Sequence, residues 1–326
     1  MTRDAKPKKS PRVVGQHLSG DERDEILRLG RELPVLEVMR RTGAARNTIN
    51  ATLRAAGVEP KRVELGLAPP SAEHPQRAHL AVHSGVVIVA SDAHYWPGPA
   101  SVAHRALVKF CAELEPVAFV LNGDAFDGAS ISRHPPIGWE DRPTVAQEVE
   151  ACQERLAEIV DALPRRAART WCCGNHDLRF ETRLATVAPE YARVHGIHLK
   201  DHFPEWPTAW SCFVNDDVVV KHRFKGGLWA PANNALWGGR TMVTGHLHSA
   251  KTLPVTDYNG TRWGVDTGCI ADPYAAAFTD YLEDGPRNWI QAFAVLTFHK
   301  GVLLWPELVV AVDKASVQFR GQLIRV

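Results

Sequence analysis

The most informative segment of the chain is Trp171-Cys172-Cys173-Gly174-Asn175-His176-Asp177. Its apolar run ends in glycine and then presents an amide, an imidazole and a carboxylate in succession. This order is typical of a buried strand that delivers polar side chains to the catalytic edge of a sheet. Taken alone, the segment also fits an ordinary turn, because Asn and Asp favour turns.

Four further apolar runs end in the same way, in groups that can donate oxygen or imidazole nitrogen to a ligand. They are Val86–Ala90 before Ser91-Asp92-Ala93-His94, Val117–Leu121 before Asn122-Gly123-Asp124-Ala125-Phe126-Asp127, Val218–Val220 before Lys221-His222, and Met242–Thr244 before Gly245-His246-Leu247-His248. Helical stretches near residues 102–114, 144–163 and 178–187 alternate with the first three strands. This alternation predicts an α/β fold whose ligands gather beyond the carboxyl ends of the strands.

The later half of the chain is rich in strand-like segments with few helices between them. These segments are residues 218–224, 241–244, 262–266, 292–298 and 302–312. We expect them to form a second, more antiparallel sheet packed on the first.

Length and charge suggest one large domain with a basic appendage. The chain has 326 residues, of which 45% are hydrophobic, enough for a large α/β domain and a small second part. Residues 1–62 carry 14 Lys or Arg against 8 Asp or Glu, a balance of +6, so a total of +1 leaves −5 for the other 264 residues. We therefore expect a polyanion to meet the N-terminal part first.

The sequence divides into four regions, and none of them predicts export or membrane insertion. We expect a disordered basic tail at 1–19, a helical domain at 20–62, a Pro-rich linker at 63–82 and the main domain at 83–326. The basic N-terminus lacks an apolar signal core, and no run approaches the roughly 18 apolar residues of a membrane span. The six cysteines have no CxxC spacing and are expected to be buried in a reducing compartment. These features predict a soluble, cytoplasmic protein.

Residues 20–62 resemble a helix-turn-helix, as found in resolvase-like and phage regulatory proteins. Two short helical runs flank the turn Thr42-Gly43-Ala44-Ala45, and the second run would pack Ile49 and Leu53 inward. The resemblance implies that four side chains of this run face a DNA groove: Arg46, Asn47, Asn50 and Arg54. Met39 departs from the small residue usual in the first helix of such motifs. The alternative is a helical appendage with a solvated basic face.

The strand ends together offer seven oxygen or nitrogen donors and no thiolate. The donors are the carboxylates Asp92 and Asp124, the amide Asn175, and the imidazoles His94, His222, His246 and His248. Such a set suits two divalent metals of borderline hardness, such as manganese, iron or zinc. A carboxylate can bridge two such ions, and the pair activates water for in-line attack on phosphorus. The sequence therefore predicts hydrolysis of a phosphate ester.

The ordered motifs resemble those of the calcineurin-like metallophosphoesterases. The matching motifs span about residues 86–250: Asp92-x-His94, Gly123-Asp124-x-x-Asp127, Gly174-Asn175-His176-Asp177, His222, and Gly245-His246-x-His248. The resemblance implies a four-layered α/β/β/α sandwich. It also implies a first metal on Asp92, His94, Asp124 and His248, and a second on Asp124, Asn175, His222 and His246. Manganese is the expected metal, with iron, zinc or nickel as alternatives.

The same resemblance implies a catalytic pair outside the ligand set. His176 would hydrogen-bond the phosphate and protonate the leaving oxygen, with Asp127 orienting its ring. Arg133 and His134, in the loop after the second motif, are candidates to hold a phosphate oxygen.

Three functions stay open from the sequence. Gly128 and Asp177 replace the Arg and Glu that characterise the protein Ser/Thr phosphatases of the family, so we expect instead a phosphodiesterase or nuclease acting on nucleic acid. The alternatives are a phosphomonoesterase acting on nucleotides, and a DNA-binding protein with a vestigial hydrolase body. The sequence leaves the oligomeric state undetermined.

Overall fold

The computed structural model describes residues 18–33, 35–59, 74–134, 141–275, 278 and 288–326. The chain divides into two compact units, Met1–Glu73 and His74–Val326, which are described separately below. Residues 1–17 of the expected tail (1–19) and residues 63–73 of the expected linker (63–82) lie outside the described residues.

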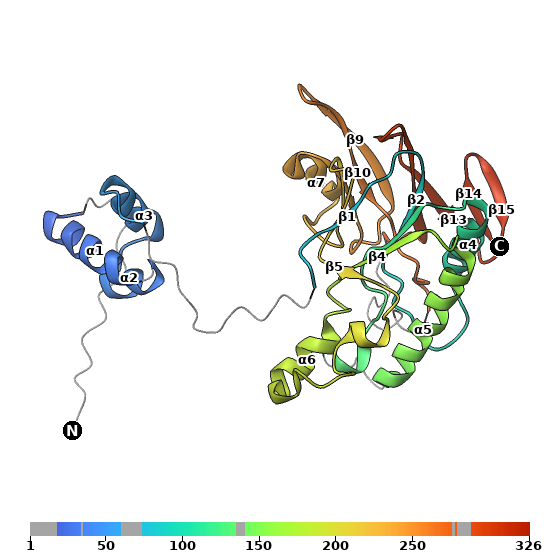
Figure 1. Cartoon of the computed structure of the whole chain (residues 1–326), viewed down its shortest axis with the longest axis horizontal. Helices are drawn as coiled ribbons and strands as arrows, with labels where there is room; N and C mark the ends of the chain where they lie inside the picture. The colour runs from blue at the N-terminus through green and yellow to red at the C-terminus, as the bar shows by residue number, and fades with distance from the viewer. Residues whose placement is uncertain (1–17, 34, 60–73, 135–140, 276–277, 279–287) are drawn as a thin grey trace. The chain divides into compact units, whose positions relative to one another are not determined.

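In the first unit, the described residues form three helices around a small apolar core (Figure 1). They are α1 (Gly20–Glu32), α2 (Val35–Thr42) and α3 (Arg46–Ala55). Ser19 begins α1 with a capping box, in which its side chain accepts from the Glu22 N–H and the Glu22 side chain accepts in return. Ile49 and Leu53 of α3 are fully buried, as the helical spacing predicted. Gly30 lets α1 approach α3 closely, because a Cβ there would clash with the Leu53 side chain.

The second unit is a mixed α/β structure with two sheets. In the larger sheet, β2 (Gly85–Ala90), β3 (Ala118–Leu121), β4 (Ala168–Cys172) and β5 (Thr208–Ala209) run parallel. The antiparallel part continues on the other side of β2 with β11 (Ala292–His299), β13 (Glu307–Ala311), β14 (Ser316–Phe319) and β15 (Gln322–Arg325), while β12 (Val302–Leu303) pairs with β11.

The smaller sheet has six strands, in the order β1-β6-β7-β8-β10-β9. The strands are β1 (Ala78–Leu80), β6 (Cys212–Val214), β7 (Val218–Val220), β8 (Thr241–Thr244), β9 (Lys251–Asp257) and β10 (Gly260–Asp266). Three of its five pairings are parallel, so the expected antiparallel character was wrong. The physical reason is helix α7 (Ala230–Gly238), which carries the chain from β7 back to a parallel β8.

The last strands of the chain also differ from expectation. Residues 292–298 and 302–312 were assigned to the second sheet, but β11 pairs with β2 in the larger one. The apolar strand β2 would otherwise be an open edge, and β11 covers that edge while burying both of its own faces. The strand β1 likewise lies within the range assigned to the linker, because its Ala78–Leu80 backbone pairs with β6.

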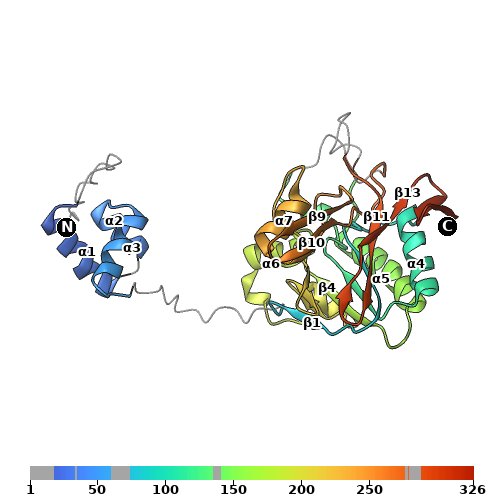
Figure 2. The same cartoon turned by 90° about the horizontal axis from the view of Figure 1, so that it is seen from above.

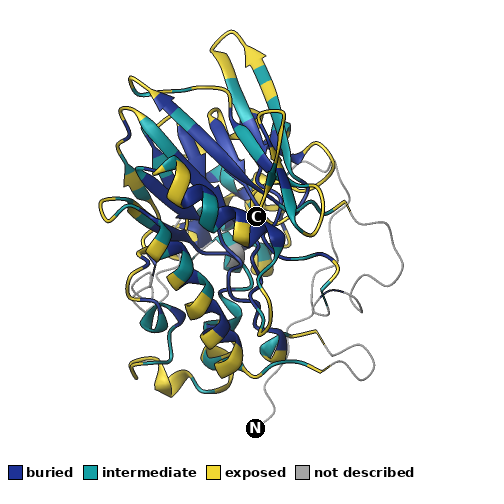
Figure 3. Ribbon diagram, turned by 90° about the vertical axis from the view of Figure 1, so that its right-hand side faces the viewer, coloured by how far each residue is buried: buried dark blue, intermediate teal, exposed yellow. Residues whose placement is uncertain are grey.

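Helices cover the sheets from outside, and an apolar core fills the space between the sheets. Figure 2 shows α4 (Val102–Leu114) and α5 (Val145–Ala162) beside the larger sheet and α7 beside β9 and β10. Valines of β2, β3, β7, β8 and β10 form the core between the sheets, and Figure 3 shows buried strands at the centre of the second unit. Shorter elements are α6 (Arg179–Val187), η1 (Ala129–Ile131), η2 (Pro189–Tyr191) and η3 (Leu199–His202). Within the described residues, no helix combines the length and apolarity that a membrane crossing needs.

Candidate metal centre

The loops after β2, β3, β4, β7 and β8 bring most of the predicted donors into one site. Parallel strands present their carboxyl ends at the same edge of a sheet, and here the edges of both sheets meet. Three overlapping groups have ligand atoms that all lie within 4.8 Å of one another: Asp92 with His94 and His248, His94 with Asp124 and His176, and Asp124 with His222 and His246.

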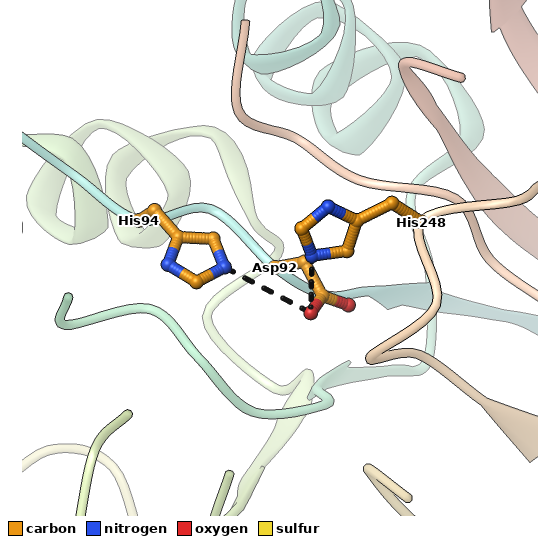
Figure 4. A group of neighbouring side chains, drawn as sticks. All are labelled: Asp92, His94 and His248. Atoms are coloured by element: carbon orange, nitrogen blue, oxygen red, sulfur yellow. Dashed lines mark hydrogen bonds and ion pairs between the residues drawn. The ribbon is translucent and has the colours of Figure 1, made fainter. Parts of the chain in front are cut away.

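The first group joins the two sheets. Figure 4 shows His94 and His248 on either side of Asp92, with dashed lines to the same carboxylate oxygen. The Asp92 Oδ1 atom lies 3.0 Å from His248 Nε2 and 3.9 Å from His94 Nε2. Its Oδ2 atom accepts the backbone N–H of His246 at 2.8 Å, which ties the loop after β8 to the loop after β2. All three side chains of the group are buried.

The second group consists of Asp124, His222 and His246. The Asp124 Oδ2 atom lies 3.0 Å from His222 Nε2, and the His222 and His246 rings are 5.3 Å apart between centroids. Because Asp124 also lies in a group with His94, its carboxylate stands between the two sets of donors. Such a position suits a carboxylate that bridges two ions.

Unpartnered polar atoms test whether a metal fits these residues. Among the described residues, four buried side-chain atoms at the site make no hydrogen bond: His94 Nε2, Asn175 Oδ1, His222 Nε2 and His248 Nδ1. Two of them, His94 Nε2 and His222 Nε2, face only the carboxylates of Asp92 and Asp124. Buried polar atoms without partners are costly, and in native proteins each one calls for an explanation such as an ion. These atoms belong to predicted ligands, so the donor set fits divalent cations.

The carboxylates and imidazoles of the site shift one another's pKa values in opposite directions. Burial raises the pKa of Asp92, but the His248 and His222 imidazoles outweigh burial and lower that pKa to about 2. Asp124 shows the same balance, and its pKa lies below the usual range. In the opposite direction, burial would lower the pKa of His222, yet Asp124 and Asp92 raise it to about 10. Metal binding would therefore displace a proton from His222, since only neutral imidazole ligates.

The backbone at the ligands is held in an uncommon conformation. Five of the predicted ligands have positive φ angles: Asp92 (56°), His94 (42°), Asp124 (53°), His246 (71°) and His248 (57°). Non-glycine residues rarely adopt this region, and such strain clusters at functional sites where surrounding structure enforces it.

Asp177 holds the loop that carries one of these ligands, Asp124. Its carboxylate accepts the backbone N–H groups of Asp124, Ala125 and Phe126 at 2.9, 3.0 and 3.1 Å. It also accepts the Gly174 N–H at 2.8 Å and the indole N–H of Trp171 at 3.0 Å. The loop after β4 thus fixes the loop after β3, and a Cβ on Gly174 would clash with the Asp124 carboxylate. Asp177 acts on the ligands through the backbone and not as a ligand.

His176 and Asp127 form a pair beside the ligands. The His176 Nδ1 atom donates to Asp127 Oδ1 at 2.7 Å, and His94 Nδ1 donates to the same oxygen at 2.8 Å. Burial lowers the pKa of His176, but its bond to Asp127 and the charge of Asp124 outweigh burial and raise that pKa. Asp127 therefore orients one predicted ligand and the predicted acid together.

Arg179 joins this pair, and the sequence analysis missed it. Its Nη1 atom donates to the Asp127 carbonyl at 3.0 Å, and Nη2 lies 3.1 Å from His176 Nε2. The only sequence signal was its position three residues after His176, where the chain turns into α6.

Arg133 and His134 are placed differently from the ligands. Both are exposed in the loop after η1, where Arg133 Nε lies 3.5 Å from His134 Nε2. Within the part of the chain that the structure describes, neither contacts a predicted ligand. The cysteines that flank the central segment, Cys172 and Cys173, are buried, as are the other four.

A cavity of about 400 Å³ opens beside His94. Trp96, Arg155 and Phe278 are among its lining residues, and the Phe278 ring meets His94 edge to face with 5.4 Å between centroids. Tyr95 also lines it, and the Tyr95 hydroxyl pairs with His104 Nδ1 at 2.9 Å. The space is large enough to hold part of a substrate whose phosphate lies at the predicted ligands.

Comparisons with known proteins add little to this geometry. A scan against protein-family models and a search of curated proteins gave no match. Among solved structures, Vps29 from Entamoeba histolytica matches as a single mutant (13% identity) and as the wild type complexed with zinc (15%), each with a TM-score of 0.39 and covering 74% of this chain and 98% of that one. Vps29 from Chaetomium thermophilum matches at 12% identity and a TM-score of 0.37, covering 74% and 97%. TM-scores this low do not establish a common fold.

Proposed function

We propose that the chain is a metal-dependent phosphoesterase of the calcineurin-like type that hydrolyses phosphodiester bonds in nucleic acid. The observation that carries the proposal is the convergence of five strand ends on one buried site with unpartnered ligand atoms. The arrangement of two packed sheets between helices supports the four-layered α/β/β/α architecture of that family.

The ligands divide into two sets that share one carboxylate. Asp92, His94 and His248 would hold one ion with Asp124, and Asn175, His222 and His246 would complete the other. We propose manganese for both positions, with iron, zinc or nickel as alternatives. When bound, such a pair activates water for in-line attack on phosphorus and offsets the negative charge of the phosphate.

His176 supplies the proton that the leaving oxygen needs. Its Nδ1–H donates to Asp127, so Nε2, which lies 3.1 Å from Arg179 Nη2, is the nitrogen that would face a substrate. Arg179 lies beside that nitrogen, so its positive charge would attract a phosphate oxygen bound next to His176. Arg133 and His134 would reach the phosphate only if their exposed loop moved, so we propose that they contribute less to phosphate binding than Arg179 does.

The first unit would recruit the enzyme to DNA. Arg46, Asn47 and Arg54 are exposed on α3, opposite the buried Ile49 and Leu53, and Asn50 is partly exposed. Residues 18–59 carry seven Lys or Arg and seven Asp or Glu, so binding would depend on this α3 face and not on bulk charge.

The proposal is tested by comparing a phosphodiester with a phosphomonoester. Bis-p-nitrophenyl phosphate and p-nitrophenyl phosphate would be offered with manganese to the native protein, to Asp124→Asn, and to Asp161→Asn as a control with an exposed aspartate. We expect diester hydrolysis by the native and control proteins and none by Asp124→Asn. Hydrolysis of the monoester alone would favour the nucleotide phosphomonoesterase. No turnover with manganese, iron, zinc or nickel would favour a DNA-binding protein with a vestigial hydrolase body.

A further inference from the structure

The loop that follows the predicted ligand His222 forms an exposed cluster of rings and cations with α7. Phe224 is 43% exposed and Trp237, near the end of α7, is 74% exposed. The Lys225 Nζ atom lies 5.5 Å from the Phe224 ring centroid and 4.6 Å from that of Trp237, and Lys221 Nζ lies 5.6 Å from Phe224. We call Lys221, Phe224, Lys225 and Trp237 the lysine–aromatic patch.

The patch is held in place by buried contacts behind it. The Asn234 side chain of α7 is buried, and its Oδ1 atom accepts the Lys225 N–H at 2.9 Å. Its Nδ2 atom lies 3.4 Å from Thr244 Oγ1 at the end of β8. The loop is therefore fixed to both α7 and β8, and its side chains are exposed on a rigid base.

The charged residues in the sequence around the lysine–aromatic patch are all positive. Between residues 218 and 256 the chain has five Lys or Arg and no Asp or Glu. An exposed aromatic surface among cations complements a strand of stacked bases with negative phosphates. The lysine ammonium groups over these rings make cation–π contacts that favour one arrangement of the patch.

The patch adjoins the predicted metal centre along the chain. Lys221 directly precedes His222, whose ring lies 5.3 Å from that of His246, and Phe224 follows two residues later. A nucleic-acid strand bound to the patch, with a phosphate at every nucleotide, would therefore extend into the site. This adjacency favours the substrate itself over a separate partner protein or a lipid surface.

We propose that the lysine–aromatic patch binds single-stranded nucleic acid, stacking unpaired bases on Phe224 and Trp237 while Lys221 and Lys225 contact the adjacent phosphates. The proposal rests on the phosphodiesterase function above, and it narrows the substrate class, since bases in a duplex are paired and cannot stack on protein side chains. The scissile phosphate would then lie at the predicted ligands, with the flanking nucleotides across the patch.

Binding and turnover can be measured separately to test this. Fluorescence anisotropy in EDTA would follow a fluorescein-labelled 12-nucleotide single strand and the corresponding duplex, with native protein, Trp237→Ala and Lys225→Ala. The control is Trp305→Ala, which removes a tryptophan of similar exposure, 61%. The ring of Trp305 packs on that of Trp263 at 4.1 Å between centroids. The residue after Trp263, Gly264, lies against Pro231 at the start of α7. Because neighbouring residues of a strand face opposite sides of the sheet, Trp263 and Trp305 lie on the side away from α7.

We expect Trp237→Ala to weaken single-strand binding by about 5-fold to 100-fold, the range typical of one base–aromatic stack. Duplex binding and hydrolysis of bis-p-nitrophenyl phosphate should not change, because a small diester reaches only the predicted ligands. Unchanged single-strand affinity in both patch variants, or an equal loss in Trp305→Ala, would overturn the proposal. So would a loss confined to binding of phosphatidylglycerol vesicles, which would assign the patch to a membrane surface.

The two proposals can fail independently. If the native protein does not hydrolyse bis-p-nitrophenyl phosphate but Trp237→Ala still loses single-strand affinity, the patch stands as a binding surface and the enzymatic function is wrong. If the diester is hydrolysed and the patch variants bind as the native protein does, the function stands and the patch is wrong.

Discussion

The buried carboxyl group of Glu148 predicts a measurable dependence of stability on pH. Glu148 lies on α5 with no exposed surface, and its Oε1 atom accepts the Ala129 N–H at 3.0 Å. Its Oε2 atom is buried and has no hydrogen-bond partner among the described residues. Burial raises the pKa of this group from 4.5 to about 8. The folded protein therefore keeps a proton on Glu148 over a pH range in which the unfolded chain has lost it.

The sign and size of the effect follow from proton linkage. Between pH 4.5 and about 8 the folded state binds more protons than the unfolded state, so the free energy of unfolding falls as pH rises. With these two pKa values the Glu148 contribution to stability falls by about 3 kcal/mol between about pH 5 and about pH 8. Glu148→Gln keeps the shape of the side chain and cannot titrate, so it should not show this loss.

Urea unfolding followed by tryptophan fluorescence provides the assay. All ten tryptophans lie beyond residue 73, so the signal reports the second unit alone. Between about pH 5 and about pH 8, the unfolding free energy of Glu148→Gln should rise by about 3 kcal/mol relative to that of the native protein. Glu150→Gln, two residues along the same helix and exposed, should show no such shift. Parallel pH profiles for native protein and Glu148→Gln would refute the reasoning.

Three further predictions concern the candidate site and the first unit. Gly174→Ala should reduce manganese affinity and diester hydrolysis by about 10-fold to 100-fold, because the new Cβ displaces the Asp124 carboxylate; calorimetric titration with unchanged affinity would contradict this. His176→Ala should slow hydrolysis of a dinucleotide by about 100-fold or more but affect bis-p-nitrophenyl phosphate much less, since nitrophenolate leaves without a proton; equal losses on both substrates would argue against a general acid. Arg46→Ala should weaken duplex DNA binding and reduce the slope of log K against log salt by about 1; an unchanged slope would remove α3 from the DNA contact.

The local order of the second unit could be predicted because its signals are local. The alternation of apolar runs with helical stretches gave β2, α4, β3, α5, β4 and α6 close to their observed bounds. The polar groups at the strand ends predicted the candidate site for the same reason, since parallel strands place their carboxyl ends together. Asp92 and His94 follow β2 and His248 follows β8, so the group comes from two sheets, yet each residue lies close after the end of its strand.

Features that depend on distant contacts could not be predicted. The pairing of β11 with β2 joins segments about two hundred residues apart, and no local pattern distinguishes it from pairing within the second sheet. The positive φ of Asp124 accompanies tertiary bonds such as the one from its N–H to Asp177, and nothing in the residue type demands it. The roles of Glu148 on α5 and Arg179 on α6 likewise depend on how these helices pack against distant parts of the chain.

The most direct test of the dinuclear phosphoesterase is a titration of the metal-free protein with Mn²⁺ while hydrolysis of bis-p-nitrophenyl phosphate is followed. The rate should rise until two ions are bound per chain and then level off, and EDTA should abolish it. Asp124→Asn, which lacks the shared carboxylate, should stay inactive at every ratio. Absence of turnover at any ratio, or a fully active Asp124→Asn, would contradict the proposed function.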